Sequence, residues 1–199
     1  MSRKSSTALV AGASRGLGLG LARELFGRGW SVIGTARDAQ KAEGLQQLAA
    51  ASDGRVVVET LDIDDPQELE ALAGRLKDRR IDLLFVNAGI SGAQGPIERS
   101  TDEDLLRVMQ TNAIGPIRLA QRLLPQVVEG GKIAFMTSLM GSIADNGSGG
   151  FDLYRISKAS LNMLTRSFVA TAVKDRNVTV LSLHPGWVRT DMGGPAAPL

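Results

Sequence analysis

Short apolar runs alternate with longer amphipathic segments along the whole chain. The apolar runs are rich in valine, isoleucine and leucine and rarely alternate with polar residues; they are Thr7–Ala11, Ser31–Ala36, Arg55–Leu61, Ile81–Asn87, Lys132–Thr137 and Val178–Leu183. Runs of this kind are typical of strands that are covered on both faces, as in a parallel sheet. The pattern therefore predicts six parallel β-strands.

Segments of helical length fill the spaces between these strands. The predicted helices cover residues 15–28, 66–79, 100–110, 113–129 and 153–173. Asp65 and Ser100 stand at two of the helix starts, and each has a glutamate three residues later, which predicts a capping box at both positions. The pair Gly115-Pro116 is expected to interrupt the fourth helix.

The alternation of strands and helices favours an α/β fold with right-handed crossovers. A length of 199 residues fits one domain, since a domain commonly holds about 150 residues. In such sheets ligands bind beyond the carboxyl ends of the strands, at the point where the strand order reverses. The residues that follow each strand are therefore the candidates for a site.

Composition and charge exclude several functional classes. The 23 Lys and Arg residues nearly balance the 21 Asp and Glu residues, and no dense basic run is present, so a dedicated nucleic-acid binder is not expected. The absence of cysteine excludes disulfides, thiolate zinc sites and a cysteine nucleophile. The single histidine, His184, excludes a multi-histidine metal site and argues against a Ser-His-Asp triad. No metal site is expected.

The sequence contains no membrane signal. Its apolar runs are far shorter than the roughly 18 residues of a transmembrane helix. Arg3 and Lys4 near the N-terminus are followed by an apolar stretch too short for a signal peptide. We therefore expect a cytoplasmic protein without a membrane partner.

A glycine-rich loop follows the first predicted strand. Gly12, Gly16 and Gly18 stand between that strand and the first helix, with Arg15 inside the loop. Glycine permits a tight turn and a close approach to a pyrophosphate, and the helix N-terminus supplies N–H donors. A strand before the loop and a helix after it are the context that a dinucleotide-binding loop requires. The alternative is a glycine-rich turn without a ligand.

The end of the second strand bears on the choice of cofactor. Arg37 lies about 20 residues beyond the glycines, where a dinucleotide fold contacts the adenosine ribose. Guanidinium groups at Arg15 and Arg37 favour a 2′-phosphate, and hence NADP(H). The alternative is that both are solvated arginines and that Asp38 binds the ribose of NAD(H).

The third and fourth strands end in further polar residues. Asp62 lies at the tip of the third strand, where it would accept from an adenine amino group; ordinary loop polarity explains it equally well. Asn87-Ala88-Gly89 follows the fourth strand and suits the close passage of a ribose, although an ordinary turn has the same composition.

Tyr154 and Lys158 give the sharpest chemical signal. Their i, i+4 spacing places them on one face of a helix. A phenol is a poor acid or base near neutral pH, and a neighbouring ammonium is expected to lower its pKa. Ser138 ends the fifth strand, where its hydroxyl would donate to a carbonyl oxygen of a substrate; a capping serine is the alternative.

Together these motifs resemble the short-chain dehydrogenase/reductase family in its classical branch. The resemblance runs from Thr7 to about Asp191 and rests on the order and spacing of the motifs. They are Gly12-x-x-x-Gly16-x-Gly18, Asn87-Ala88-Gly89, Asn112, Ser138, Tyr154-x-x-x-Lys158 and Pro185-Gly186. The stretch from Gly141 to Tyr154 is most similar to small bacterial carbonyl-reductase-like and C-factor-like members, which include intercellular signalling factors.

The resemblance implies roles for four catalytic residues. Tyr154 would be the general acid for carbonyl reduction and the base for alcohol oxidation. Lys158 would lower the pKa of Tyr154 and hold the ribose of the cofactor, and Ser138 would position the carbonyl. Asn112 would disturb its helix and connect Lys158 to a chain of waters; a polar residue between two helices is the alternative.

The resemblance also implies which residues bind NADP(H), with NAD(H) the less favoured cofactor. The segment from Pro185 to Thr190 is similar to the one that lies on the nicotinamide. The expected cofactor set is Gly12, Ser14, Arg15, Gly16, Leu17, Gly18, Arg37, Asp62, Ile63, Asn87, Ala88, Gly89, Tyr154, Lys158, Pro185, Gly186, Val188 and Thr190. One NAD(P)-binding domain over residues 1–199 would carry these and the catalytic residues.

The implied fold is a Rossmann-type doubly wound parallel sheet with strand order 3-2-1-4-5-6. Relatives continue into a further helix and a seventh strand, which we do not expect within these 199 residues, so the sixth strand would form a sheet edge. The resemblance further implies a homodimer or homotetramer that pairs the helices near 113–129 and 153–173.

The implied activity is hydride transfer between NADP(H) and a small carbonyl or alcohol, as in a carbonyl reductase. The alternative from another class is an NADP-binding signalling or regulatory protein with little turnover. An epimerase or dehydratase of the extended branch is disfavoured by the short chain and by the glycine spacing.

Overall fold

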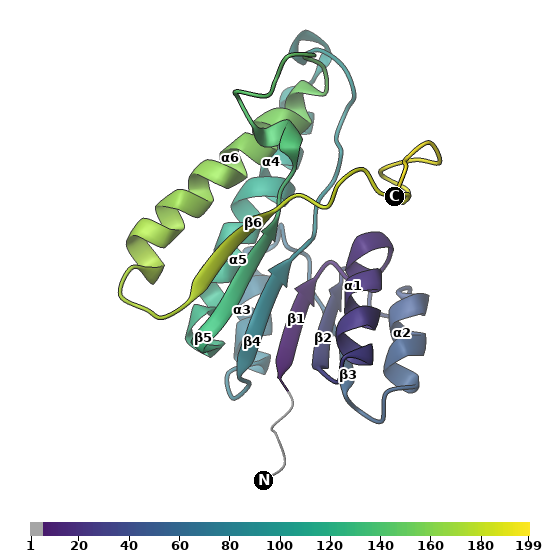
Figure 1. Cartoon of the computed structure of the whole chain (residues 1–199), viewed down its shortest axis with the longest axis vertical. Coiled ribbons are helices and arrows are strands. Elements are labelled where there is room, and N and C mark those ends of the chain that lie inside the picture. Colours follow the sequence, from purple (N-terminus) through teal and green to yellow (C-terminus); the bar gives the residue numbers. More distant parts are fainter. Residues whose placement is uncertain (1–5) are drawn as a thin grey trace.

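One parallel six-stranded sheet organises the molecule. The computed structural model describes residues 6–199, which leaves Arg3 and Lys4 outside the described residues. The strands are β1 (Thr7–Ala11), β2 (Ser31–Ala36), β3 (Val56–Thr60), β4 (Ile81–Val86), β5 (Val127–Met136) and β6 (Thr179–Leu183). They pair in the order β3-β2-β1-β4-β5-β6, and every pair is parallel (Figure 1). The predicted α/β class and strand order are confirmed.

Helices cover both faces of this sheet. They are α1 (Gly16–Gly27), α2 (Glu43–Ala50), α3 (Pro66–Arg75), α4 (Asp102–Met109), α5 (Gly115–Leu123) and α6 (Asp152–Phe168). Helices α1 and α2 lie on one face and α3, α5 and α6 on the other (Figure 1). Leu9 of β1 packs into the core on the α3–α5 side, and its neighbour Val10 packs into the core on the α1–α2 side. Burial on both sides explains the continuous apolar runs.

The helix between β4 and β5 differs from its prediction. A π-helical turn, Gln110–Ile114, joins α4 to α5, so Gly115-Pro116 begins α5 within a continuous helical segment. A short 3-10 turn, Leu124–Gln126, ends that segment. The predicted helix over 113–129 is therefore too long, and β5 begins at Val127 instead of Lys132. The glycine pair 130–131 conceals this strand start, because it breaks the apolar run within β5.

The predicted cap of α4 was wrong by one residue, whereas the predicted cap of α3 is confirmed. Thr101, and not Ser100, caps α4: its Oγ1 accepts from the Asp104 backbone N–H at 3.1 Å, and the Asp104 carboxylate accepts in return from the backbone N–H of Thr101. Asp65 caps α3 as predicted, but Glu68 accepts from the Asp62 backbone N–H instead of completing a capping box. Helix α2 was not predicted.

The segment after β6 runs across the carboxyl ends of the strands toward the start of α1 (Figure 1). Its last residues fold back, with the Arg189 N–H donating to the Leu199 carbonyl at 2.8 Å. Strand β6 lies at one edge of the sheet, as predicted. Among residues 6–199, no helix is long and apolar enough to cross a membrane.

Candidate active site

The glycine loop packs directly against the turn that follows β4. Gly12 has a φ of +82°, and a Cβ added there would lie 2.8 Å from the Cα of Ala88. A Cβ on Gly18 would lie 2.0 Å from the Gly12 carbonyl oxygen. Both positions therefore exclude any side chain, and the loop after β1 is held against the turn at 87–89.

Hydrogen bonds fix the loop in this position. The Asn87 side chain donates from Nδ2 to the Gly12 carbonyl at 2.8 Å, and the backbone N–H groups of Asn87 and Ala88 donate to the Ala11 carbonyl. Oγ1 of Thr35 accepts from the Gly12 N–H at 3.2 Å. Sequence reasoning missed Thr35, although a lone hydroxyl at the end of an otherwise apolar strand was an available signal.

The N-terminus of α1 is open to an anion. Arg15 occupies the N-cap position, no side chain caps the helix, and its first turn contains no acidic residue. The first backbone N–H groups of a helix lack partners within the helix and carry a partial positive charge. A phosphate group fits such an end.

Arg37 and Asp38 follow β2 but differ in their surroundings. Arg37 is exposed. The Asp38 carboxylate accepts from the backbone N–H groups of Gln40 and Lys41 and pairs with the Lys41 ammonium at 2.9 Å. These contacts, chiefly those with Lys41, hold the pKa of Asp38 below its usual value. The carboxylate is thus engaged in its own turn.

The residues after β3 form a small acidic corner. Ile63 is buried, and the half-buried Asp62 accepts from the Asp64 backbone N–H at 3.0 Å. Asp64 accepts from the Thr111 hydroxyl at 2.6 Å, and burial raises the pKa of its carboxyl group. Asp62 therefore lies at the strand end, as predicted, with part of its hydrogen-bonding capacity used by the turn.

Tyr154, Lys158 and Ser138 come together where β5 ends beside α6. Nζ of Lys158 donates to the Met136 carbonyl at 2.9 Å and lies 5.6 Å from the centre of the Tyr154 ring. Ser138 follows β5, and its hydroxyl lies beside the Tyr154 side chain. Its Oγ also accepts from the Met140 backbone N–H at 3.1 Å, so it caps a turn as well as facing the phenol. The sequence did not predict a role for Met136, because the group that accepts from Lys158 is its backbone carbonyl and not its side chain.

Burial shifts the pKa values of the two ionisable groups in opposite directions. It lowers the pKa of Lys158 to about 8. It raises the pKa of Tyr154, and the hydrogen bond with Ser138 only partly opposes that rise. The neighbouring ammonium was predicted to lower the pKa of Tyr154, but this pKa is raised. Burial removes the phenolate from water, and this cost exceeds the stabilisation that nearby groups give to the phenolate.

Asn112 lies fully buried in the π-helical turn between α4 and α5. Its Oδ1 accepts from the Ile90 N–H at 2.8 Å, and its Nδ2 donates to the Ile90 carbonyl at 2.8 Å and to Oγ of Ser157 at 3.0 Å. Ser157 donates in turn to the Tyr154 carbonyl. The helix is disturbed at Asn112, as expected, and the side chain connects the loop after β4 to the turn that carries Tyr154.

Gly89 places the β4 turn beside these groups. A Cβ on Gly89 would lie 3.3 Å from Oδ1 of Asn112 and 3.5 Å from Nζ of Lys158. The three strand-end segments predicted from sequence, after β1, β4 and β5, are therefore brought into one region. His184, which follows β6, is exposed.

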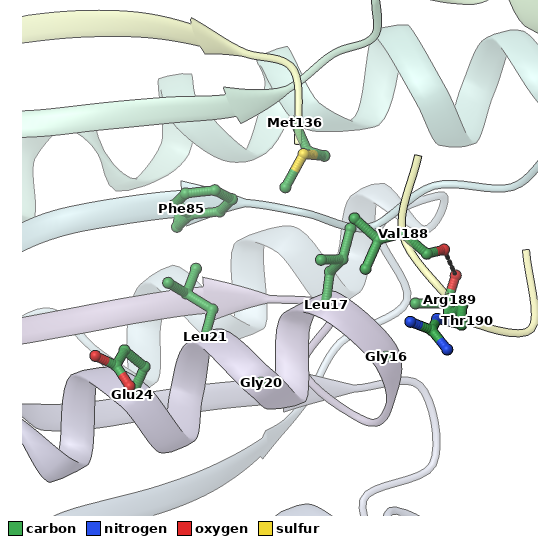
Figure 2. Close-up of a pocket in the computed structure, with 10 residues that line it drawn as sticks. All are labelled: Gly16, Leu17, Gly20, Leu21, Glu24, Phe85, Met136, Val188, Arg189 and Thr190. Atoms are coloured by element: carbon green, nitrogen blue, oxygen red, sulfur yellow. Dashed lines mark hydrogen bonds between the residues drawn. The ribbon is translucent and has the colours of Figure 1, made fainter. Parts of the chain in front are cut away.

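A cavity of about 490 Å³ lies between α1, the sheet and the segment after β6 (Figure 2). Leu17 and Leu21 of α1, Phe85 and Met136 of the sheet, and Val188 contribute apolar side chains to it. Figure 2 shows the glycine loop at one end of this cavity, beside Val188 and Thr190. Gly186 of the same segment has a φ of +83°. The segment predicted to lie on a nicotinamide thus borders the glycine loop.

The described residues contain no group of three His, Cys, Asp or Glu side chains that could hold a metal ion. The polar groups gathered at the strand ends are instead a phenol, an amine, hydroxyls and backbone N–H groups. Groups of these kinds can bind an oxygen atom and transfer a proton to it.

Comparison with known proteins adds to this geometry. The family model described as short chain dehydrogenase matches residues 6–198. The chain is 40% identical over 190 residues to 1-hydroxy-2-glutathionyl-2-methyl-3-butene dehydrogenase from Rhodococcus sp. (strain AD45), covering 94% of this chain and 80% of that protein. It is 43% identical over 133 residues to C-signal from Myxococcus xanthus, covering 66% of this chain and 80% of that one.

A solved structure agrees with the fold. A carbonyl reductase from Pseudomonas aeruginosa PAO1 in complex with NADP superimposes with a TM-score of 0.90 at 43% sequence identity. The match covers 98% of this chain and 85% of that one. The similarity extends over the sheet, the helices and the segments that form the candidate site.

Proposed function

Because this chain belongs to the short-chain dehydrogenase family, we propose that it transfers a hydride between NADP(H) and the carbonyl or alcohol group of a small molecule, as a carbonyl reductase does. The observation that carries the proposal is the arrangement of Tyr154, Lys158 and Ser138. The buried Lys158 lies beside the phenol ring of Tyr154, and the Ser138 hydroxyl lies beside the same side chain. The proposed single domain contains both the cofactor site and these residues.

The residues at the strand ends fit a phosphorylated dinucleotide. The open N-terminus of α1 suits a pyrophosphate, and Gly12 and Gly18 keep the loop free of side chains. We propose that Arg15 and Arg37 bind the 2′-phosphate of NADP(H), with NAD(H) the weaker ligand. The contacts of Asp38 with Lys41 and with its own turn support this preference, because a ribose hydroxyl would have to compete with them for that carboxylate.

The remaining cofactor contacts are proposed from position. Ser14 and Leu17 lie at the glycine loop, Asp62 and Ile63 at the end of β3, and the turn 87–89 beside Lys158. Pro185, Gly186, Val188 and Thr190 lie on the segment that borders the glycine loop. When bound, the nicotinamide supplies or accepts the hydride.

Tyr154 moves the proton in this proposal. During reduction its hydroxyl donates a proton to the carbonyl oxygen, so that the substrate gains a hydride on carbon and a proton on oxygen. During oxidation the phenolate accepts the proton of the alcohol. The Lys158 ammonium stabilises that phenolate, and the Ser138 hydroxyl donates to the substrate oxygen and orients it. Asn112 holds the turn that carries Tyr154.

We also propose a homodimer or homotetramer. Leu106 on α4 and Met163 on α6 are 69% and 67% exposed, and the two helices that carry them are in contact. A second copy that covers these helices would bury both. A cytoplasmic location stays a prediction.

A second candidate function is that of an NADP-binding signalling protein with little turnover. The similarity to C-signal is the observation that favours it. The buried Lys158 argues for catalysis, because burial of an amine disfavours its charged form and a binding module gains nothing from that cost.

The test compares wild type with Tyr154→Phe. We expect wild type to oxidise NADPH with some members of a panel of aldehydes and ketones, and Tyr154→Phe to lose at least about 100-fold in kcat with a much smaller loss of NADPH affinity. Equal turnover by both proteins would refute the role of Tyr154. Tight NADPH binding without turnover of any carbonyl by wild type would favour the signalling function.

A further inference from the structure

Arg15 and Asp191 form an ion pair that joins the glycine loop to the segment after β6. NH1 of Arg15 lies 2.7 Å from Oδ2 of Asp191, although the two residues are 176 positions apart. Their side chains are 76% and 75% exposed. The pair is therefore formed across two elements of the site, and it remains accessible to a competing anion.

The two backbones also lie close together at this point. A Cβ built on Gly16 would lie 3.4 Å from Cγ2 of Thr190, and Figure 2 shows these residues side by side. Oγ1 of Thr190 accepts from the Gly193 N–H at 3.1 Å, and the Thr190 carbonyl accepts from the Gly194 N–H at 2.8 Å. A hydrogen-bonded turn thus presents Asp191 to Arg15.

This geometry gives Arg15 two competing anionic partners. A guanidinium presents its five N–H donors in a rigid planar fork, so a carboxylate that holds the fork toward the segment after β6 turns it away from a phosphate placed elsewhere. Resting on the function proposed above, we infer that Asp191 is a positioning residue that limits the preference for NADP(H) over NAD(H). The Asp191 carboxylate holds Arg15 against the segment after β6, and the 2′-phosphate must displace it.

The sign of the effect follows from charge. Without the carboxylate, Arg15 is free for the phosphate and the local potential is more positive. NAD(H) has no 2′-phosphate, so its affinity depends much less on Arg15. Removing the charge of Asp191 should therefore strengthen NADP⁺ binding selectively. Exposed ion pairs are weak, so the expected gain is about two- to fivefold.

The experiment measures the dissociation constants of NADP⁺ and NAD⁺ by calorimetry for wild type and Asp191→Asn. We expect the constant for NADP⁺ to fall by about two- to fivefold and that for NAD⁺ to change by less than about 1.5-fold. The gain should shrink in high salt, which screens exposed charges. The same selective gain should appear with ligands that lack the nicotinamide: Asp191→Asn should bind 2′,5′-ADP more tightly than wild type does and should bind 5′-AMP equally well.

Two further variants separate this effect from general changes. Asp191→Asn in an Arg15→Ala background should give a clearly smaller gain, because only the change in local potential remains and Arg15 is no longer there to be released. Asp175→Asn removes a carboxylate that is 85% exposed and lies 3.9 Å from the ammonium of its neighbour Lys174, and it should leave both constants unchanged. An unchanged or weakened NADP⁺ affinity in Asp191→Asn, or the same gain without Arg15, would overturn the inference alone. Failure of wild type to bind either cofactor would overturn the proposed function and the inference with it.

Discussion

Asn112 and Ser157 are hydrogen-bonded inside the protein, with 3.0 Å between Nδ2 and Oγ. Both side chains are fully buried. The Ser157 hydroxyl continues to the Tyr154 carbonyl, and the other bonds of Asn112 go to the backbone of Ile90. One amide therefore sets the position of the phenol-bearing turn relative to the loop after β4.

Replacing Asn112 should destabilise the protein more than replacing Ser157. Asn112→Ala leaves the N–H and carbonyl of Ile90 without their partner, and we expect a loss of about 3 kcal/mol in the free energy of unfolding. Ser157→Ala preserves those bonds and should cost about 1 kcal/mol. Urea denaturation of both variants measures the difference. Equal losses would show that the Ile90 bonds carry no special weight.

Replacing two glycines of α1 by alanine should change the stability of the protein in opposite directions. A Cβ on Gly18 meets the Gly12 carbonyl at 2.0 Å, so Gly18→Ala must displace the glycine loop. A Cβ on Gly20 meets nothing within 4 Å, and alanine in a helix is favoured over glycine by about 0.5–1 kcal/mol. Thermal denaturation should show a lower Tm for Gly18→Ala and a slightly higher Tm for Gly20→Ala. A tolerated Gly18→Ala would contradict the packing of the loop.

The stability of wild type relative to Lys158→Met should rise with pH. Burial lowers the pKa of Lys158 to about 8 in the folded state, while it is near 10.5 when unfolded. Between these values the unfolded state binds more protons, so raising the pH favours folding. We expect a gain of about 2 kcal/mol between pH 7.5 and pH 9.5. The raised pKa of Tyr154 keeps its titration above this range.

Subtracting the Lys158→Met stability at each pH removes the contribution of all other groups. Guanidinium denaturation at four or five pH values across the window is sufficient. A difference that stays constant or falls with pH would mean that Lys158 is not desolvated as the structure indicates.

Arg37→Ala should weaken the binding of NADPH much more than the binding of NADH. Hydrogen bonds to a charged group contribute about 1.5–3 kcal/mol, so the affinity for NADPH should fall at least about tenfold. The affinity for NADH should change by less than about twofold. Arg118→Ala, which removes an exposed arginine from α5, is the matched control. If wild type binds NADH more tightly than NADPH, the assignment of Arg37 to the 2′-phosphate is wrong.

The sheet could be predicted from sequence because its strands are buried on both faces. Leu9 and Val10 are adjacent and both fully buried, so the strand reads as one apolar run. Helix α2 escaped prediction because it buries only Leu45, and Gly44 obscures its pattern. The cap of α4 was misplaced by one residue, because Ser100 and Thr101 are chemically alike and both precede an acidic residue at capping distance.

Within the site, residue types were predictable and their partners were not. Asn112 was singled out through the family resemblance, but its bonds go to the Ile90 backbone, and any residue supplies an N–H and a carbonyl. The Met136 carbonyl that accepts from Lys158 is hidden for the same reason. The direction of the Tyr154 pKa shift depends on burial, which spacing along a helix does not reveal.

The exposed apolar side chains of α4 and α6 predict that the protein forms an oligomer through these helices. Leu106 and Met163 are more than two-thirds exposed, and a partner that buries them would remove apolar surface from water on both copies. We expect light scattering to show a dimer or tetramer for wild type and a monomer for Leu106→Glu combined with Met163→Glu. Ile143→Glu, in the loop between Ser138 and Tyr154, removes another exposed apolar side chain and should leave the assembly intact. A wild-type monomer at high concentration, or dissociation by Ile143→Glu alone, would place the contact elsewhere or exclude it.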